Sequence, residues 1–213
     1  MSYGEHRLSP VDVTLCSFCS GAKRDIIEEM PSPVGHALAG IALGSLAGRD
    51  RGWGVPLVCG FVAALADVDF LLPVVHRGPT HSLTAGVVVF AVALATLRLP
   101  GPTERPVRVA AAISLAALSH VLLDWLGEDS STPRGLMAFW PFSSEYYISG
   151  LDLFDAVSRR YWREGFWRHN MIAVAKEVII LLPLVLLARR RRVSTYRNPD
   201  RSFARGGRQP PSV

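Results

Sequence analysis

Cysteine is scarce in this chain of 213 residues, which contains three of them. Three thiols cannot form the disulfide framework of a small secreted domain. Cys16 and Cys19 form a single C-x-x-C with no second pair, so a structural zinc knuckle is not indicated and a redox role has little support. The motifs G-x-S-x-G and H-E-x-x-H are also missing, which removes the commonest signals of a serine hydrolase and of a zinc peptidase.

Charged residues are absent from four long apolar stretches. A surface helix of a soluble domain carries a polar face at helical spacing, and none of the four stretches has one. They are therefore either membrane spans or the buried helices of a soluble bundle, and the missing polar faces favour spans. The stretches are residues 34–48, 53–66, 82–97 and 109–123, and a fifth, 171–188, contains only Lys176 and Glu177. We predict an all-α integral membrane bundle of about five spans.

Glycines recur at every fourth position of the first stretch. Gly40, Gly44 and Gly48 place three positions without side chains on one helix face. This spacing predicts close packing against a neighbouring helix and indicates no chemistry.

The arginines indicate how the bundle lies in the membrane. Five spans place the termini on opposite sides, and the four arginines at 189–192 place the C-terminus in the cytoplasm. The short loops then follow the positive-inside bias five to one, with Arg77 as the outer exception. The five inner residues are Arg49, Arg51, Arg98, Arg105 and Arg108. We expect a multi-pass protein of a bacterial or archaeal plasma membrane.

Composition divides the chain into three regions. Residues 30–188 contain all the apolar stretches and form the predicted membrane domain. Residues 1–29 are interpreted as an N-terminal extension, either disordered or upstream of the natural start. Residues 189–213, rich in Arg, Pro, Gly and Ser, are predicted to form a disordered cytoplasmic tail that contacts anionic lipid headgroups. No nucleic-acid-binding motif is present, so no nucleic-acid partner is expected.

Histidines and aspartates gather at the ends of the apolar stretches. Ionisable residues are costly in membrane spans and are functional by default. On the arginine-based topology these ends all lie on the outer side of the membrane. Imidazole and carboxylate groups suit Zn²⁺ and also permit Mn²⁺ or Fe²⁺, and the number of candidates allows one to three ions. The candidate metal ligands are His36, Asp67, Asp69, His76, His81, His120 and Asp124.

Spacing separates the roles of four of these candidates. His120 and Asp124 are four residues apart and share a helix face, as two ligands of one metal or a ligand and its orienting partner require. Asp67 and Asp69 are two apart and point to different sides of a regular helix. At most one of these two is therefore a primary ligand, unless the helix has ended there, and the other caps a helix, bridges metals or acts as a base.

The loop after the second stretch supplies further groups. Either His76 or His81 completes the ligand set. Arg77 is placed to hold an anionic oxygen by bidentate hydrogen bonds, or else is an ordinary loop or lipid-contacting arginine. Ser82 and Ser119 each neighbour a histidine and are expected to form supporting hydrogen bonds rather than to act as nucleophiles, and Thr80 or Ser82 is placed to cap the next helix.

Ten of the nineteen aromatic residues fall within residues 127–170. Phe154, Val157 and Tyr161 recur near helical spacing, with arginines between them. This pattern predicts an amphipathic helix over residues 153–167 in the headgroup layer. Such a helix either covers the site or forms a plain interfacial belt.

Five motifs occur in a recognisable order. They are G-H-A-L-A-G around His36, Asp67-x-Asp69, His76-Arg-Gly-x-Thr-His81-Ser, Ser119-His-x-Leu-Leu-Asp124 and Trp140-Pro-Phe-Ser143. Together they resemble the YdjM-like family of bacterial inner-membrane proteins over residues 30–188. The resemblance implies a membrane-bound, zinc-dependent hydrolase. More distantly, the order is similar to zinc-dependent phospholipase C, which uses a multi-zinc site on phosphodiesters, although the later H-x-x-x-E pair is missing here.

These patterns predict a metal-dependent hydrolase at the outer mouth of the bundle, acting on a phosphoester of a lipid or lipid-linked substrate. The predicted catalytic residues are Asp67 or Asp69, which bridges metals or takes a proton from water, and Arg77, which steadies the anion. The alternative is a non-catalytic metal-binding membrane protein, such as a transporter or an assembly factor.

Overall fold

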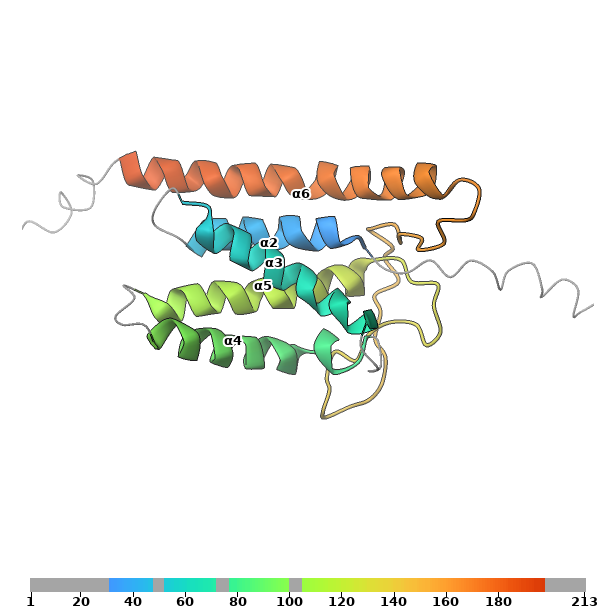
Figure 1. Ribbon diagram of the computed structural model, residues 1–213, viewed down its shortest axis with the longest axis horizontal. Coiled ribbons are helices and arrows are strands. Elements are labelled where there is room, and N and C mark those ends of the chain that lie inside the picture. The colour runs from blue at the N-terminus through green and yellow to red at the C-terminus, as the bar shows by residue number, and fades with distance from the viewer. Residues whose placement is uncertain (1–30, 48–51, 72–76, 100–104, 198–213) are drawn as a thin grey trace, which may run out of the picture.

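The computed structural model of the chain describes residues 31–47, 52–71, 77–99 and 105–197. Within these ranges the protein is mostly helical (Figure 1). The elements are α2 (Pro33–Ala47), α3 (Gly54–Leu65), η1 (Ala66–Leu71), η2 (Pro79–His81), α4 (Leu83–Arg98), α5 (Pro106–Leu126) and α6 (Phe166–Arg197), where η marks a 3₁₀ helix. The predictions made for residues 1–29, for Gly48, Arg49, Arg51 and His76, and for residues 198–213 lie outside the described residues.

Serine residues define where two of the helices begin. The N–H of Gly35 donates to Ser32 Oγ at 3.3 Å, and the N–H of Ala85 donates to Ser82 Oγ at 3.1 Å. Pro33 follows Ser32 at the first helical position, where its missing N–H costs nothing. These caps fix the starts of α2 and α4, and so they fix the positions of the histidines beside them.

Successive helices run antiparallel. Helix α2 packs on α3, α5 and α6, whereas α4 packs on α5 (Figure 1). As a result, α2, α4 and α6 begin and α3 and α5 end at the same end of the bundle, on the right in Figure 1. We call this the polar end, because the buried histidines and aspartates lie there.

Close packing of α2 on α3 depends on small residues, as the glycine spacing predicted. A Cβ atom on Gly40 would lie 2.4 Å from the carbonyl oxygen of Cys59. One on Gly44 would lie 2.8 Å from the Cα of Pro56. The backbones of the two helices therefore approach as closely as side-chain-free positions allow.

Two helices in the described part of the chain are long and apolar enough to cross a membrane: Pro106–Leu126 and Phe166–Arg191. Helices α2 and α4 are apolar but shorter. At about 1.5 Å per residue, the 16 residues of α4 cover about 24 Å of a hydrocarbon core that is about 30 Å thick. The total of five spans therefore stays a prediction.

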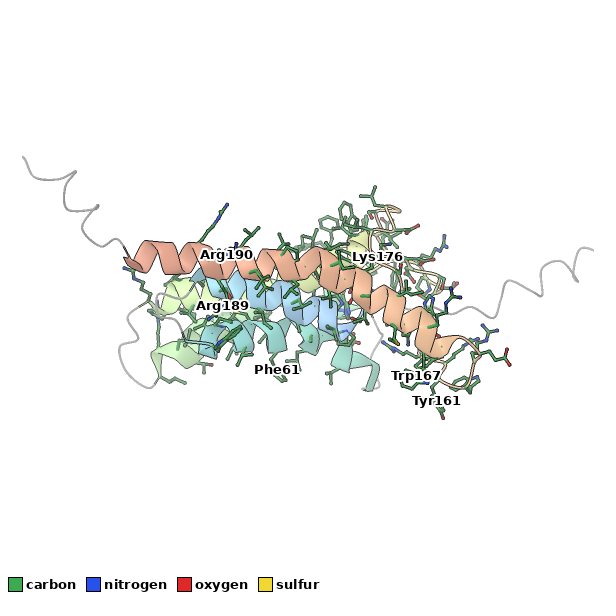
Figure 2. The ribbon with its side chains drawn as sticks, turned by 90° about the horizontal axis from the view of Figure 1, so that it is seen from above. Phe61, Tyr161, Trp167, Lys176, Arg189 and Arg190 are labelled. Atoms are coloured by element: carbon green, nitrogen blue, oxygen red, sulfur yellow. The ribbon has the colours of Figure 1, made fainter. Side chains whose placement is uncertain are left out.

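Large apolar side chains cover the outer faces of the bundle. Phe61 on α3, Val87 on α4 and Ile179 on α6 are all exposed, and Phe61 points away from the other helices in Figure 2. A surface of this kind is suited to contact with lipid and not with water.

The predicted helix over residues 153–167 is wrong. Residues 127–165 have no α-helix, and α6 begins only at Phe166, after Gly165 with a φ of +81°. The backbone N–H of Glu128 donates to the carbonyl oxygen of Phe154 at 2.8 Å, which ties this stretch to the end of α5 in an extended form. Phe154 and Ala156 are buried while Asp155 between them is not, so the apolar side chains alternate as in a strand.

The C-terminal tail also differs from the prediction. Helix α6 continues to Arg197, so residues 189–197 are helical and not disordered. Arginine is a strong helix former, and its charge is favourable near the negative end of the helix dipole. Arg189, labelled in Figure 2, stacks its guanidinium 3.7 Å from the centre of the Trp53 ring, which anchors α6 to the start of α3.

Candidate metal centre

Four elements bring histidine and aspartate side chains together inside the polar end. His36 lies in the first turn of α2, Asp67 in η1, His81 in η2, and His120 and Asp124 in the last turns of α5. All five side chains are buried. They meet because the antiparallel order places the start of α2 and the ends of α3 and α5 side by side.

Asp124 lies between two histidines. Its Oδ2 is 3.1 Å from the Nε2 of His120, the residue one turn earlier on the same face. Its Oδ1 is 3.2 Å from the Nε2 of His36, on α2. The rings of His36 and His120 are stacked, with 3.8 Å between their centres. The predicted i, i+4 pair on α5 is therefore completed by a histidine from another helix.

Asp67 and His81 close the cluster from the opposite side. Asp67 Oδ1 lies 3.6 Å from His120 Nε2 and 4.0 Å from His81 Nε2. Its Oδ2 lies 4.0 Å from His36 Nε2. His81 Nε2 is also 3.5 Å from Asp124 Oδ2. The three histidines and two aspartates thus form two groups that could each hold a metal ion, His36 with His120 and Asp124, and Asp67 with His81 and His120. Both groups contain His120, and we call the five residues together the donor cluster.

The outer nitrogens of two histidines are held by the protein. The Nδ1 of His120 is 2.7 Å from the carbonyl oxygen of Ala63, which can only accept, so this nitrogen carries the proton. The Nδ1 of His81 is 3.2 Å from Asp69 Oδ2, an oxygen that also accepts a 2.6 Å hydrogen bond from Thr80 Oγ. In both rings the proton is placed on Nδ1, and Nε2 keeps the lone pair that a metal ligand needs.

This contact gives the two aspartates of η1 different positions. Asp67 faces the donor cluster, whereas Asp69 supports a histidine from behind. The sequence left the choice between them open. Thr80 lies within the His76-Arg-Gly-x-Thr-His81-Ser motif, but neither Thr80 nor the Ala63 carbonyl was among the predicted site residues.

Several atoms of the donor cluster are buried without a hydrogen-bond partner among the described residues. They are both ring nitrogens of His36, Nε2 of His120, Oδ2 of Asp67 and both carboxylate oxygens of Asp124. Buried polar groups are normally hydrogen-bonded, and buried charges are paired or coordinate metals. These atoms therefore fit a group that is itself positively charged.

The distances within the donor cluster fit a zinc-like ion. The six Nε2-to-carboxylate distances given above run from 3.1 to 4.0 Å. Donors at about 2.0–2.1 Å from one ion lie about 2.9–4.1 Å from each other, depending on the coordination geometry. Three imidazoles and two carboxylates also match the ligand preference of Zn²⁺.

Arg77 lies outside the donor cluster and contacts polar residues of the segment 127–165. Its guanidinium forms a buried ion pair with Asp129 and donates to Ser131 Oγ at 2.5 Å. Burial raises the pKa of the Asp129 carboxyl, but hydrogen bonds from Arg77, the Gly135 N–H and Ser131 outweigh burial and leave the pKa below its ordinary value. Among the described residues, Nε and Nη2 of Arg77 have no hydrogen-bond partner.

Ser82 and Ser119 form hydrogen bonds with the backbone near them in the chain. Ser82 Oγ donates to the carbonyl oxygen of Pro79 at 2.7 Å while it caps α4, and Ser119 Oγ donates to that of Ala116 at 2.7 Å. Ser82 therefore provides the predicted helix cap, and both hydroxyls donate to backbone carbonyls of their own segments. Local backbone acceptors are closer to a short hydroxyl side chain than the rings are.

The fold and the donor cluster together define a mostly helical membrane protein with a buried histidine and aspartate site at one end of its bundle. The chain belongs to the family of YdjM inner membrane proteins, which matches residues 30–193. This match confirms the resemblance found in the sequence motifs. Comparisons with curated proteins and with solved structures give no significant match.

Proposed function

We propose that this protein is a metal-dependent hydrolase that cleaves a phosphoester of a lipid or lipid-linked substrate at the outer face of the membrane. The observation that carries the proposal is the donor cluster, which contains two groups of possible metal ligands and in which several buried imidazole and carboxylate atoms lack hydrogen-bond partners among the described residues. Such atoms are costly to bury unless they bind a cation.

His36, His81, His120 and Asp124 would hold one zinc ion. Bound there, it would supply Lewis-acid chemistry and lower the pKa of a bound water. The sequence allowed one to three ions, and the short distances within the cluster favour one. Residues 72–76, which include His76, lie outside the described ranges, so the site that we propose consists of the described donors.

Asp67 is the residue that we propose as proton acceptor. Its side chain is 11% exposed, whereas those of the three histidines and Asp124 are fully buried. Asp67 therefore lies on the side of the cluster that water can reach. Its carboxylate would take a proton from the attacking water. Asp69 would act as a positioning residue through His81.

Arg77 is proposed to bind the anionic oxygens of the substrate. Asp129 and Ser131 fix one side of its guanidinium, so the group is oriented before substrate binds. The Nε and Nη2 edge is the pair of donors that suits a phosphate or carboxylate.

The surroundings of the polar end suit a substrate held in a membrane. Phe142, Tyr161, Trp162 and Trp167 are exposed there, and Figure 2 shows Tyr161 and Trp167 at this end of the molecule. Aromatic side chains of this kind favour the headgroup layer. In the proposed arrangement the five helices cross the membrane, the polar end lies outside, and the arginines at the start of the tail contact anionic lipid inside.

The rival function is a non-catalytic metal-binding protein, a transporter or an assembly factor. The full burial of His36, His81 and His120 favours it, because a closed site suits a permanently held ion. The two functions differ in whether purified, metal-loaded protein releases product.

The deciding assay offers phospholipids and lipid-linked phosphates in detergent, with and without a chelator. Wild type should release phosphate or a phosphorylated headgroup only with metal, and His120→Ala and Asp67→Asn should lose at least about 100-fold of the rate. His169→Ala is the matched control, because His169 bonds to the Ala156 carbonyl outside the donor cluster. Chelator-resistant release, or equal release by all variants, would mean another chemistry. A metal-loaded protein inactive on every substrate would favour the rival.

A further inference from the structure

A single carboxylate from α6 reaches the start of α2. Glu177 is fully buried although it lies in the apolar stretch of residues 171–188. Its Oε1 accepts the backbone N–H of Ser32 at 2.5 Å, and its Oε2 accepts the Ser32 hydroxyl. Both carboxylate oxygens therefore bind the residue that caps α2, which is 145 positions away in the chain.

The start of α2 is a place where a negative charge is stabilised. The first N–H groups of a helix have no partner within the helix and form the positive end of its dipole. Ser32 accepts one of them, the N–H of Gly35, at 3.3 Å. Glu177 extends this cap from a second helix, so that a charge that is costly to bury in the bundle is compensated there.

Gly35 makes this contact possible. A Cβ atom on Gly35 would lie 2.7 Å from Oε2 of Glu177. Only glycine therefore lets the carboxylate sit against the first turn of α2. The next residue in the same turn is His36, which belongs to the donor cluster.

We propose that Glu177 is a positioning residue for His36, which it holds in register by fixing the first turn of α2. The inference rests on the proposed metal centre. No residue of α6 belongs to the donor cluster, and Glu177 links α6 to the turn of α2 that contains His36. A first turn that frays or rotates would move His36 Nε2 away from Asp124, to which it is now 3.2 Å distant.

The test is cobalt binding to purified, chelator-stripped protein in detergent, followed by the visible absorption of the bound ion. Glu177→Ala should weaken Co²⁺ affinity about tenfold or more, as loss of an outer partner of a ligand does, and should change the spectrum, because His36 is no longer held. Glu177→Asp, which keeps the charge on a shorter side chain, should recover part of the affinity. Lys176→Ala is the matched control, since the neighbouring ammonium pairs with Asp155 at 2.5 Å and not with α2; it should bind as wild type does.

Gly35→Ala tests the same contact from the other side. Its added methyl group displaces the carboxylate and should weaken Co²⁺ binding as Glu177→Ala does. In the Glu177→Ala background the methyl group has room, so Gly35→Ala should add no further loss. The double variant therefore tests whether Gly35 and Glu177 act through the same contact, even if one single variant is recovered in poor yield.

The possible results separate the two proposals. Wild-type Co²⁺ affinity and spectrum in Glu177→Ala would overturn the positioning role, and so would an equal loss in Lys176→Ala. Additive losses in the double variant would also overturn it, because the two residues would then act independently. If wild-type protein itself binds no Co²⁺, the proposed metal centre fails, and the role of Glu177 fails with it.

Discussion

His120 and Ala63 are joined by a 2.7 Å hydrogen bond from the imidazole Nδ1 to the carbonyl oxygen. The bond links α5 to α3 and fixes the proton of the ring on the side away from the donor cluster. Because Nε2 then has a lone pair and faces Asp67 and Asp124, the histidine is prepared as a ligand before any ion arrives. A site of this kind should bind metal without large rearrangement.

Metal content is the first prediction. Purified protein should contain about one zinc-like ion per chain by elemental analysis, because we propose one ion in the donor cluster. The double variant His120→Ala and Asp124→Ala removes two adjacent donors and should lose most of it. The matched control, His169→Ala with Asp155→Ala, removes the same two residue types outside the donor cluster and should keep its metal. An unchanged metal content in the His120→Ala and Asp124→Ala variant would contradict the assignment of the donor cluster as a metal site.

The two aspartates of η1 should differ in how added metal affects them. Asp69→Asn loses the charged partner of His81 and should weaken metal affinity about 10–100-fold, a loss that excess zinc restores. Asp67→Asn removes the proposed proton acceptor, so excess zinc should not restore the hydrolytic activity of this variant. Titration of activity against free zinc measures both effects. Full rescue of Asp67→Asn, or none for Asp69→Asn, would reverse the proposed roles.

Sequence alone was sufficient for the features that depend on local spacing. The i, i+4 relation places His120 and Asp124 on one face wherever the helix lies, and the Gly40 and Gly44 spacing predicts a close helix contact. The sequence could not predict the distances between segments that are far apart in the chain. The distance from His36 to Asp124 depends on how α2 packs on α5.

Two features depend on three-dimensional contacts that the sequence does not reveal. The distinction between Asp67 and Asp69 depends on the 3₁₀ geometry of η1 and on the hydrogen bond from Thr80 to Asp69. Helical spacing misled the prediction around Phe154, because hydrogen bonds to the end of α5 hold that stretch extended. A lone glutamate in an apolar stretch signals that it needs a partner, but not which one.

The Arg77 and Asp129 pair should make stability depend on pH. The folded pKa of Asp129 is depressed, so the pair stabilises the protein above the unfolded aspartate pKa of about 3.9, and that stabilisation is lost as pH falls through the folded pKa. Asp129→Asn should therefore cost about 1–3 kcal/mol near neutral pH, because it leaves a buried guanidinium poorly satisfied. The difference from wild type should shrink below about pH 4.

Thermal unfolding in detergent with chelator, at several pH values, measures this difference. Glu145→Gln is the control, as it removes a carboxylate from the same segment whose contact with Tyr147 is exposed. It should show no comparable effect at any pH. A difference between Asp129→Asn and wild type that stays constant down to low pH would contradict the pair as its source.

The side of the membrane on which the polar end lies is the last prediction. Ser144, in the residues 127–165, and Leu99, after the end of α4, are both exposed and lie at opposite ends of the bundle. Single cysteines at these positions, in a Cys16→Ser and Cys19→Ser background, leave only the buried Cys59 as a further thiol. In intact spheroplasts an impermeant maleimide should label Ser144→Cys at once and Leu99→Cys only after lysis, because the arginine bias of the short loops places the polar end outside. The reverse pattern would place the donor cluster at the cytoplasmic face, and a substrate would then have to come from the inner leaflet.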